Sequence, residues 1–248
     1  MIQVADDRYN GYILSCSNKQ LDLDEAFKSA LKDVIEDAKN KQKALLWLDL
    51  TVEQASYIAI ALTLGFEFHN CEAKRTTLTY CIQEDTYVPV SPSHTIGVGA
   101  VVINKNNELL MVRDRIHNNH SIYKLPGGML EHAQCLEEGV VREVWEETGV
   151  KAKLIKMVSL LNSHPYRFNK SNMYIVFQLE ALTTEINVID THEIEEAIWM
   201  PLSEFFAHTE MSEFQKDLVN KALQCDGLKL MDNEDKYFKG KKHVEVYG

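Results

Sequence analysis

The sequence predicts two domains, a small α/β domain followed by an α+β domain. Strand-like and helix-like apolar patterns alternate over residues 11–82, whereas strands dominate from residue 95 onward and only two helices interrupt them. The stretch at 83–93 contains Pro89 and Pro92 and has no clear period, so we place the domain boundary there. The expected divisions are a first domain at 1–85, a linker at 86–93, a second domain at 94–226 and a polar, partly disordered tail at 227–248.

The first domain is predicted to have a β-α-β-α-β-β order. A helix is expected over 24–40, because apolar residues from Leu23 to Ala38 recur at helical spacing and Asp22 with Glu25 matches a capping box. The other predicted elements are strands at 11–17, 43–50, 66–68 and 76–82, and a helix at 52–64 that stops at Gly65.

A glycine-rich turn and the helix after it are the most informative part of the second domain. The turn Pro126-Gly127-Gly128 leads into a helix predicted over 136–148, and Gly149 is its expected C′ residue. The other predicted elements are strands at 95–104, 109–113, 152–162, 173–180 and 198–200, a hairpin turn at 105–108 and a helix at 214–224.

Composition narrows the class of substrate. The chain has 26 basic and 37 acidic residues, a net charge of −11, whereas a domain that grips a nucleic-acid polymer usually carries a basic stripe. We therefore expect a small-molecule substrate and no long nucleic acid, with metal ions mediating any contact to an anion. No apolar run is long enough to span a membrane, and the N-terminus lacks signal-peptide features. Five scattered cysteines without a CxxC pair indicate reduced thiols and a cytoplasmic protein.

Three carboxylates share one face of the helix at 136–148. On a helical wheel, Glu143, Glu146 and Glu147 lie within an arc of about 100°. The apolar residues from Val140 to Val144 lie on another arc, which can pack on a sheet. Hard oxygen ligands of this kind select Mg²⁺, Mn²⁺ or Ca²⁺ and not zinc.

The glycines and one arginine make this acidic face distinctive. An acidic pair alone is more often a solvated helix face. Gly128 lets backbone atoms approach a metal or a phosphate closely, and Arg142 can orient the acids. Residues of these types at these spacings should co-occur by chance on the order of 10⁻⁵ per chain or less.

Residues Gly128–Val150 resemble the Nudix box, Gly-x5-Glu-x7-Arg-Glu-U-x-Glu-Glu-x-Gly-U, in which U is aliphatic. Both U positions hold valine, and only Gln134 departs from the pattern, where the family has Glu. The segments Tyr123–Gly128 and Ile198–Leu202 also resemble the family's strands before the box and after the catalytic loop. The resemblance implies a Nudix α/β/α sandwich with a mixed sheet.

The resemblance also implies hydrolysis of a nucleoside diphosphate linked to another moiety, with Mg²⁺ or Mn²⁺. By position, Glu143, Glu146 and Glu147 would be metal ligands, and the Gly128 region would add a backbone oxygen. Either Glu143 or an acid further along the chain would orient or deprotonate the attacking water. Arg142 would orient these acids.

The family often takes a further catalytic Glu from the loop before its last strand. Glu193, Glu195 and Glu196 are candidates in this chain, and the distance in sequence from Trp199 favours Glu193. Any one of them is also compatible with an ordinary exposed loop acid.

Gln134 leaves two readings of the activity open. It can still accept a hydrogen bond from Arg142, but it loses the charge-assisted part, about 1 kcal/mol. The chain is then either a weakened enzyme or a nucleotide-binding regulator that turns over slowly. RNA 5′-end processing is a third reading, which the net charge of −11 disfavours.

The first half of the chain points to one branch of the family. Segments such as Gly65–His69 and Ser93–Ala100 resemble a two-domain Nudix group. That group includes plant ADP-ribose and NADH pyrophosphatases and an animal protein encoded antisense to a fibroblast growth factor. The resemblance implies ADP-ribose or NADH as substrates. The first domain is also similar to half of an acetyltransferase domain, and we expect it to form a homodimer or to cover the substrate.

Several residues are candidates for substrate binding. Backbone groups of Gly127 and Gly128 can approach the phosphates, and Arg113 and Arg167 can bind phosphate oxygens. Tyr123 can stack on adenine. Aromatic residues of this kind more often serve in packing, and a solvated surface role for the arginines is equally open.

Overall fold

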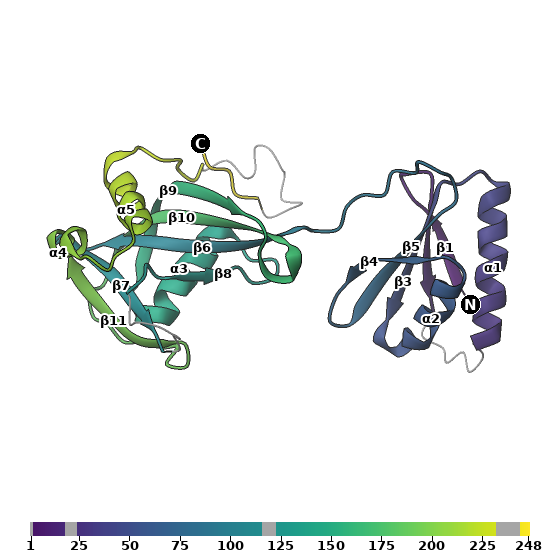
Figure 1. The fold of residues 1–248 in the computed structure, drawn as a ribbon, viewed down its shortest axis with the longest axis horizontal. Helices are drawn as coiled ribbons and strands as arrows, with labels where there is room; N and C mark the ends of the chain where they lie inside the picture. Colours follow the sequence, from purple (N-terminus) through teal and green to yellow (C-terminus); the bar gives the residue numbers. More distant parts are fainter. Residues whose placement is uncertain (1, 18–23, 116–122, 232–243) are drawn as a thin grey trace. The chain divides into compact units, whose positions relative to one another are not determined.

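The computed structural model describes residues 2–17, 24–115, 123–231 and 244–248. The chain forms two compact units, Met1–Pro92 and Ser93–Gly248. Their elements are labelled in Figure 1. Leu23 and Asp22, which we used to predict the start of the first helix, lie outside the described residues.

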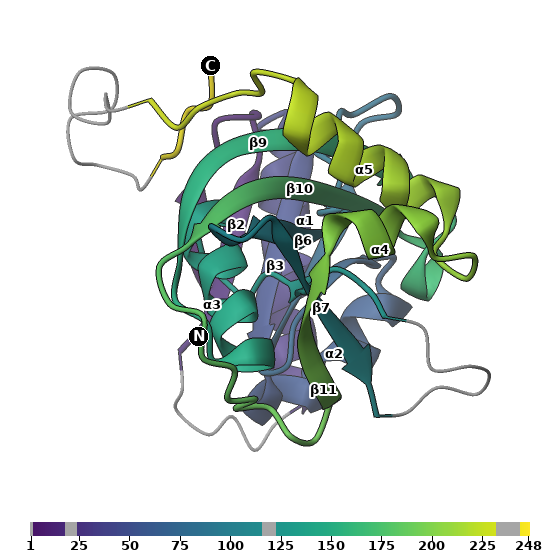
Figure 2. The ribbon, with the colours of Figure 1, turned by 90° about the vertical axis from the view of Figure 1, so that its left-hand side faces the viewer.

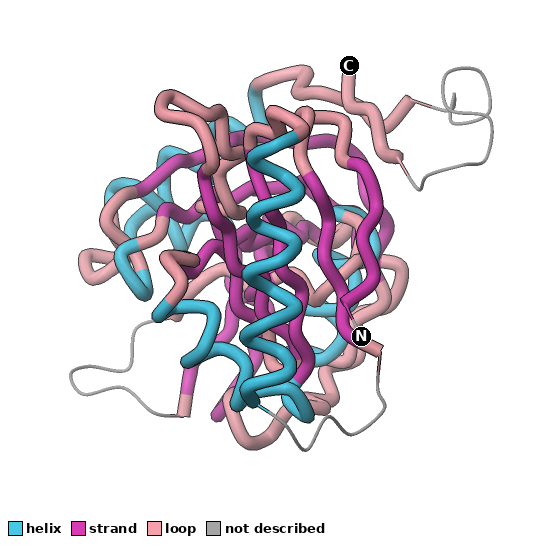
Figure 3. The backbone as a smooth tube through the Cα atoms, turned by 90° about the vertical axis from the view of Figure 1, so that its right-hand side faces the viewer, coloured by secondary structure: helices cyan, strands magenta, loops and turns pink. Residues whose placement is uncertain are grey.

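The N-terminal unit is a five-stranded sheet with two helices on one face. The strand order is β1-β2-β3-β5-β4, with β2 and β3 parallel and the other pairs antiparallel. In Figure 3 the long helix α1 lies in front of these strands. Phe27 of α1 stacks on Tyr57 of α2 with ring centroids 4.0 Å apart. The elements are β1 (Ile2–Asp6), β2 (Tyr12–Cys16), α1 (Asp24–Asn40), β3 (Leu45–Thr51), the 3₁₀ turn η1 (Val52–Gln54), α2 (Ala55–Thr63), β4 (Glu67–Cys71) and β5 (Arg75–Cys81).

The predicted order of this unit is correct except at its start. The helix predicted at 24–40 is confirmed, and its apolar stripe is buried. The prediction missed β1, a five-residue edge strand that is mostly exposed and whose apolar and polar residues do not alternate strictly. The second predicted helix starts with a 3₁₀ turn, and at its beginning the Gln54 side chain accepts a hydrogen bond from the Thr51 amide at 3.0 Å.

The C-terminal unit is an α/β/α sandwich, which confirms the predicted fold class. Its sheet has the order β11-β7-β6-β10-β9, with β8 also paired to β6. Strands β6 and β10 are parallel and the other pairs antiparallel, so the sheet is mixed. Figure 2 shows α3 on one side of the sheet and α4 with α5 on the other. The elements are β6 (His94–Ile103), β7 (Glu108–Asp114), β8 (Gly127–Met129), α3 (Leu136–Thr148), β9 (Ala152–Ser163), the 3₁₀ turn η2 (Arg167–Asn169), β10 (Ser171–Ala181), β11 (Ile194–Pro201), α4 (Leu202–Ala207) and α5 (Glu213–Gln224).

Two separate cores hold the sandwich together. Val98, Val140 and Val144 belong to the core between the sheet and α3. Val101 and Phe205 belong to the core on the opposite face. Because β6 lies between two covered faces, its apolar residues form a nearly continuous run in the sequence.

Strand β11 begins earlier than predicted, at Ile194 instead of Ile198. Glu195 and Glu196 therefore lie on a strand and not in a loop. A register shift between Ile194 and Glu196 interrupts the pairing with β7. Charged residues and this irregularity hide the strand from a search for alternating apolar positions. The short elements β8 and α4 were also missed.

In the parts that the structure describes, the polar tail makes contacts with the rest of the C-terminal unit. Leu228 pairs with Met157 of β9, and Leu230 pairs with Tyr247. The Glu245 carboxylate accepts hydrogen bonds from the first two amides of α3, at 2.7 and 3.0 Å. Such long-range contacts leave no local pattern in the sequence. Across the described residues, no helix is long and apolar enough to cross a membrane.

Candidate active site

Helix α3 holds the acidic residues against the sheet. Val140, Val144 and Thr148 are fully buried, so the helix has one face fixed in the core. It ends at Gly149, whose φ of 73° is left-handed and whose added Cβ would lie 2.3 Å from the Asn187 carbonyl oxygen. The predicted bounds of this helix and its glycine C-cap are both confirmed.

Strand β8 brings two glycines directly onto two of these acids. The Gly127 amide donates a hydrogen bond to Oε2 of Glu147 at 2.7 Å. Gly127 has a φ of 150°, and a Cβ there would lie 2.2 Å from the Val98 carbonyl oxygen. A Cβ on Gly128 would lie 2.7 Å from the carboxylate of Glu143. Only glycine at position 127 allows this close approach, whereas a side chain at position 128 would displace the Glu143 carboxylate.

The Glu147 side chain is buried, with 3% of the residue exposed. Burial raises the pKa of its carboxyl to about 8, although Lys124 and the Gly127 amide oppose the shift. Burial also raises the pKa of Glu143. Buried carboxylates that accumulate like this are stabilised by a cation. The donors are all oxygen atoms, which suits Mg²⁺ or Mn²⁺.

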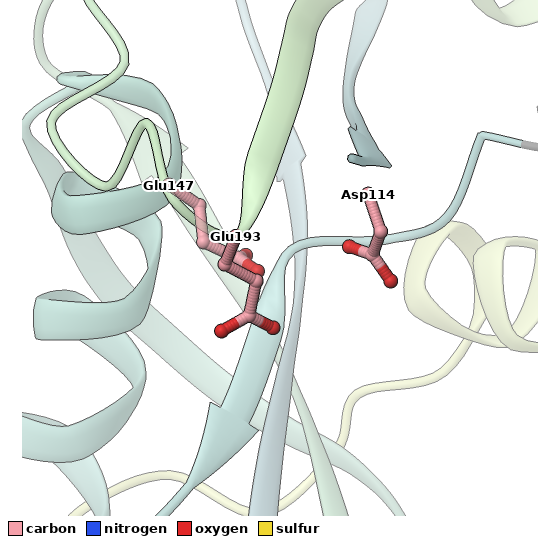
Figure 4. A group of neighbouring side chains, drawn as sticks. All are labelled: Asp114, Glu147 and Glu193. Carbon is pink, nitrogen blue, oxygen red and sulfur yellow. The ribbon is translucent and has the colours of Figure 1, made fainter. Parts of the chain in front are cut away.

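Asp114, Glu147 and Glu193 form a cluster in which carboxylate oxygens from all three lie within 4.8 Å of one another. Figure 4 shows these side chains, from the end of β7, from α3 and from the residue before β11. The Lys124 Nζ lies 2.7 Å from Asp114 Oδ1 and 3.8 Å from Glu147 Oε1. The prediction missed Asp114 and Lys124, because a single acid at a strand end and a single lysine carry no spacing signal.

Arg142 forms hydrogen bonds with both Glu143 and Glu146 of α3. Its Nη1 donates to Glu146 Oε2 at 2.7 Å, and its Nη2 donates to Glu143 Oε1 at 2.9 Å. The same Nη2 donates to Gln134 Oε1 at 3.2 Å and to the Met129 carbonyl at 3.1 Å. The buried Nε of Arg142 has no hydrogen-bond partner among the described residues. Gln134 thus contacts the arginine as expected but accepts from only one of its nitrogens.

The loop that carries Glu193 is fixed by hydrogen bonds from Arg115, the residue after β7. The Arg115 amide donates to the Glu193 carbonyl at 2.7 Å. The Arg115 guanidinium donates to the carbonyls of Thr191 at 2.9 Å and Ile194 at 3.3 Å. Within the loop, Asp190 Oδ1 accepts from the Glu193 amide at 3.1 Å. A cavity of about 400 Å³ opens here, lined by Asp114, Asp190, His192 and Glu193.

The other substrate-binding candidates are less central. Arg113 pairs with Glu195 at 3.2 Å and with Glu196 at 2.9 Å. The Tyr123 hydroxyl donates to Glu196 at 2.6 Å. Arg113 and Tyr123 are therefore bound to acidic side chains of strand β11. They are the chain neighbours of Asp114 and Lys124, but their polar groups already have protein partners. Arg167 lies in η2 and does not line the cavity.

Both halves of the chain match known protein families, and the whole chain is similar to known Nudix proteins. A family model described as a NUDIX domain matches residues 93–222, and one described as a Nudix hydrolase domain matches residues 2–82. Nudix hydrolase 8 of Arabidopsis thaliana is 35% identical over 83% of this chain and 56% of its own length. Nudix hydrolase 5 of the same plant is 31% identical over 90% of this chain and 76% of its own length. The human protein named Nucleoside diphosphate-linked moiety X motif 6 is 34% identical over 72% of this chain and 57% of its own length.

The sandwich, the glycine turn and the acidic helix define a Nudix hydrolase domain. The chain belongs to the Nudix hydrolase family, which acts on nucleoside diphosphate derivatives. It spans little more than half the length of Nudix hydrolase 8 and of the human relative. The resemblance to the two-domain plant and animal group is confirmed by these matches.

Proposed function

We propose that this chain hydrolyses the diphosphate bond of ADP-ribose or NADH, releasing AMP, with Mg²⁺ or Mn²⁺ as cofactor. The observation that carries the proposal is the buried carboxylate of Glu147, held by the Gly127 amide and close to Glu193. A carboxylate at this depth is expensive in a folded protein unless a cation or a proton accompanies it. The human relative's name, which refers to a nucleoside diphosphate-linked moiety, supports the substrate class.

The proposed ligands of the ion are Glu143, Glu146, Glu147 and the backbone oxygen of Gly128. When bound, the ion supplies charge neutralisation for the diphosphate and activation of the attacking water. Glu143 and Glu146 each give one oxygen to Arg142, which leaves the other oxygen of each carboxylate for the ion.

The chain's own residues complete the proposed mechanism. Glu193 lines the cavity beside the acidic helix and is placed to accept the proton of the attacking water. Arg142 orients two ligands at once, and the Gly127 amide fixes a third. Arg113 and Tyr123 would have to exchange their contacts with Glu195 and Glu196 for contacts with substrate.

A second candidate is a nucleotide-binding regulator with little turnover. Gln134 favours it, because this residue replaces the family's Glu and leaves the Arg142 Nε without an acceptor among the described residues. Such a protein would bind ADP-ribose in a metal-dependent way and release almost no AMP.

The N-terminal unit is proposed to form a homodimer or to cover the substrate, in a cytoplasmic protein. A dimer predicts an apparent mass of about twice 28.4 kDa in size-exclusion chromatography with light scattering. Elution as a monomer over a range of concentrations would leave substrate covering as the remaining role.

The decisive experiment is a substrate panel with Mg²⁺ and Mn²⁺ in which AMP and phosphate release are measured. Glu147→Gln should lower turnover more than about 100-fold, because it removes a charged ligand worth several kcal/mol. The matched control is Glu138→Gln, an exposed acid on the same helix, which should retain wild-type rates. Equal rates for both variants would refute the metal assignment. Metal-dependent ADP-ribose binding without AMP release would select the regulator.

A further inference from the structure

Lys124 is held rigidly beside the acidic cluster. The Lys124 amide donates to the Val112 carbonyl at 2.8 Å, and the Lys124 carbonyl accepts from the Val112 amide at 2.9 Å. Its side chain is 29% exposed and ends between two acids, 2.7 Å from Asp114 Oδ1 and 3.8 Å from Glu147 Oε1. The ammonium group is therefore a fixed positive charge at one end of the site.

Two basic side chains divide the acids of the site between them. Arg142 pairs with Glu143 and with the more exposed Glu146. Lys124 pairs with Asp114 and with the buried Glu147. Each basic side chain therefore has its own pair of acidic partners.

The cluster of Asp114, Glu147 and Glu193 has the donors of a divalent-ion site of its own. A divalent ion bound to Asp114 Oδ1 at about 2.1 Å would lie within about 5 Å of the Lys124 ammonium. Two cations at this separation in a partly buried site repel each other strongly. The ammonium and an ion shared by Asp114 and Glu147 therefore exclude one another.

We propose that Lys124 is a built-in cation that replaces a divalent ion at the Asp114 end of the site. Divalent ions then bind only at the other end of the site, formed by Glu143, Glu146, Glu147 and the backbone oxygen of Gly128. The lysine positions Glu147 and limits the number of ions in the free enzyme. This inference rests on the proposed function in one respect, the assignment of Glu143 and Glu147 as ion ligands.

The test is the number of Mn²⁺ ions that the full chain binds without substrate, measured from free Mn²⁺ by electron paramagnetic resonance. Lys124→Met has a similar length and no charge, and it should bind one more Mn²⁺ per chain than the wild type. Lys124→Arg keeps the charge and should bind the wild-type number. The matched control is Lys105→Met, an exposed lysine in the turn after β6, which should also bind the wild-type number.

A double variant identifies where the additional ion binds. Asp114→Asn in the Lys124→Met background removes one of the proposed ligands and should abolish the additional Mn²⁺. An unchanged number of ions in Lys124→Met overturns the inference. So does an additional ion that survives Asp114→Asn, since it must then bind elsewhere. If Lys124→Met does not fold by circular dichroism, Lys124→Gln is the variant measured, with the same two outcomes.

The ion count also separates this inference from the proposed function. A wild-type chain that binds Mn²⁺ but hydrolyses neither ADP-ribose nor NADH contradicts the proposed function, while the comparison with Lys124→Met still decides the role of the lysine. If Glu147→Gln binds as many ions as the wild type, the ligand assignment on which both depend is wrong.

Discussion

The amide of Gly127 donates a 2.7 Å hydrogen bond to the carboxylate of Glu147, and this bond joins the glycine strand to the acidic helix. The carboxylate that receives it is 3% exposed, and its pKa is raised to about 8. One backbone donor and one lysine thus only partly offset the cost of burying this charge. This cost lowers the free energy of unfolding of the metal-free protein, so the cost can be measured without any substrate.

Stability of the metal-free protein should fall with rising pH because of Glu147. Its carboxyl has a pKa of about 8 in the folded state and near 4.5 when exposed, so the folded state holds the extra proton between these values. Stability from this group is therefore lost as pH rises from about 5 to 8, by at most about 1.4 kcal/mol per pH unit. Urea unfolding in a chelator should show this slope in the wild type and not in Glu147→Gln. Parallel curves for the two proteins would contradict the pKa shift.

Gln134→Glu should raise activity modestly, by about 3- to 10-fold. A carboxylate offers a second acceptor oxygen, which can take a hydrogen bond from the Arg142 Nε and adds a charge-assisted contact of about 1 kcal/mol. Turnover on the best substrate is the measurement, and Gln3→Glu in β1 controls for the added negative charge. An increase from no activity to full turnover would mean that residue 134 does more than support Arg142.

Arg115→Gln should slow turnover without changing ion binding. The Arg115 guanidinium donates to the carbonyls of Thr191 and Ile194 on either side of Glu193, and the loss of these two bonds lets the proposed base move away from the attacking water. We expect kcat to fall roughly 10- to 100-fold while KM stays within a factor of about three. The number of bound Mn²⁺ ions should remain that of the wild type. Arg75→Gln, which removes an ion-paired arginine of the N-terminal unit, is the matched control. A kcat equal to that of the control would show that the loop holds its shape without Arg115.

Glu245→Gln should destabilise the C-terminal unit by about 1 kcal/mol. The carboxylate accepts from the Leu136 and Glu137 amides at the positive end of the α3 dipole, where Cys135 provides no side-chain cap. Urea unfolding measures the loss, and Glu180→Gln, an exposed acid of β10, controls for the charge change. Equal stability of the two variants would show that the tail carboxylate does not cap the helix in solution.

The sequence predicted the parts of the site that lie within one local pattern. Residues close together in the chain were enough to predict helix α3, its end at Gly149 and the contact of Gln134 with Arg142. The wheel also placed Glu147 on the acidic face, but it could not show that the carboxylate is buried under β8. That burial depends on the register between β8 and β6, which no local pattern contains.

The site residues outside the Nudix box could not be predicted either, because their positions also depend on strand pairing that no local pattern contains. Asp114 and Lys124 reach the cluster because β7 ends there and because residue 124 pairs with Val112. Glu196 was assigned to a loop because the bulge in β11 disrupts the alternation that marks a strand. In each case the decisive contact joins segments far apart in the chain.

The cap on α3 also has a consequence in time. The Leu136 amide and the Glu245 carboxylate that receives its hydrogen bond are 109 residues apart in the chain. At a synthesis rate of about 5 to 20 residues per second, the ribosome needs roughly 5 to 20 s to reach the second after making the first. During that interval the nascent chain lacks the carboxylate that caps α3 in the folded protein, so any α3 that forms then has two uncapped amides. The last contact to this helix comes from a residue that is not a proposed ligand of the ion.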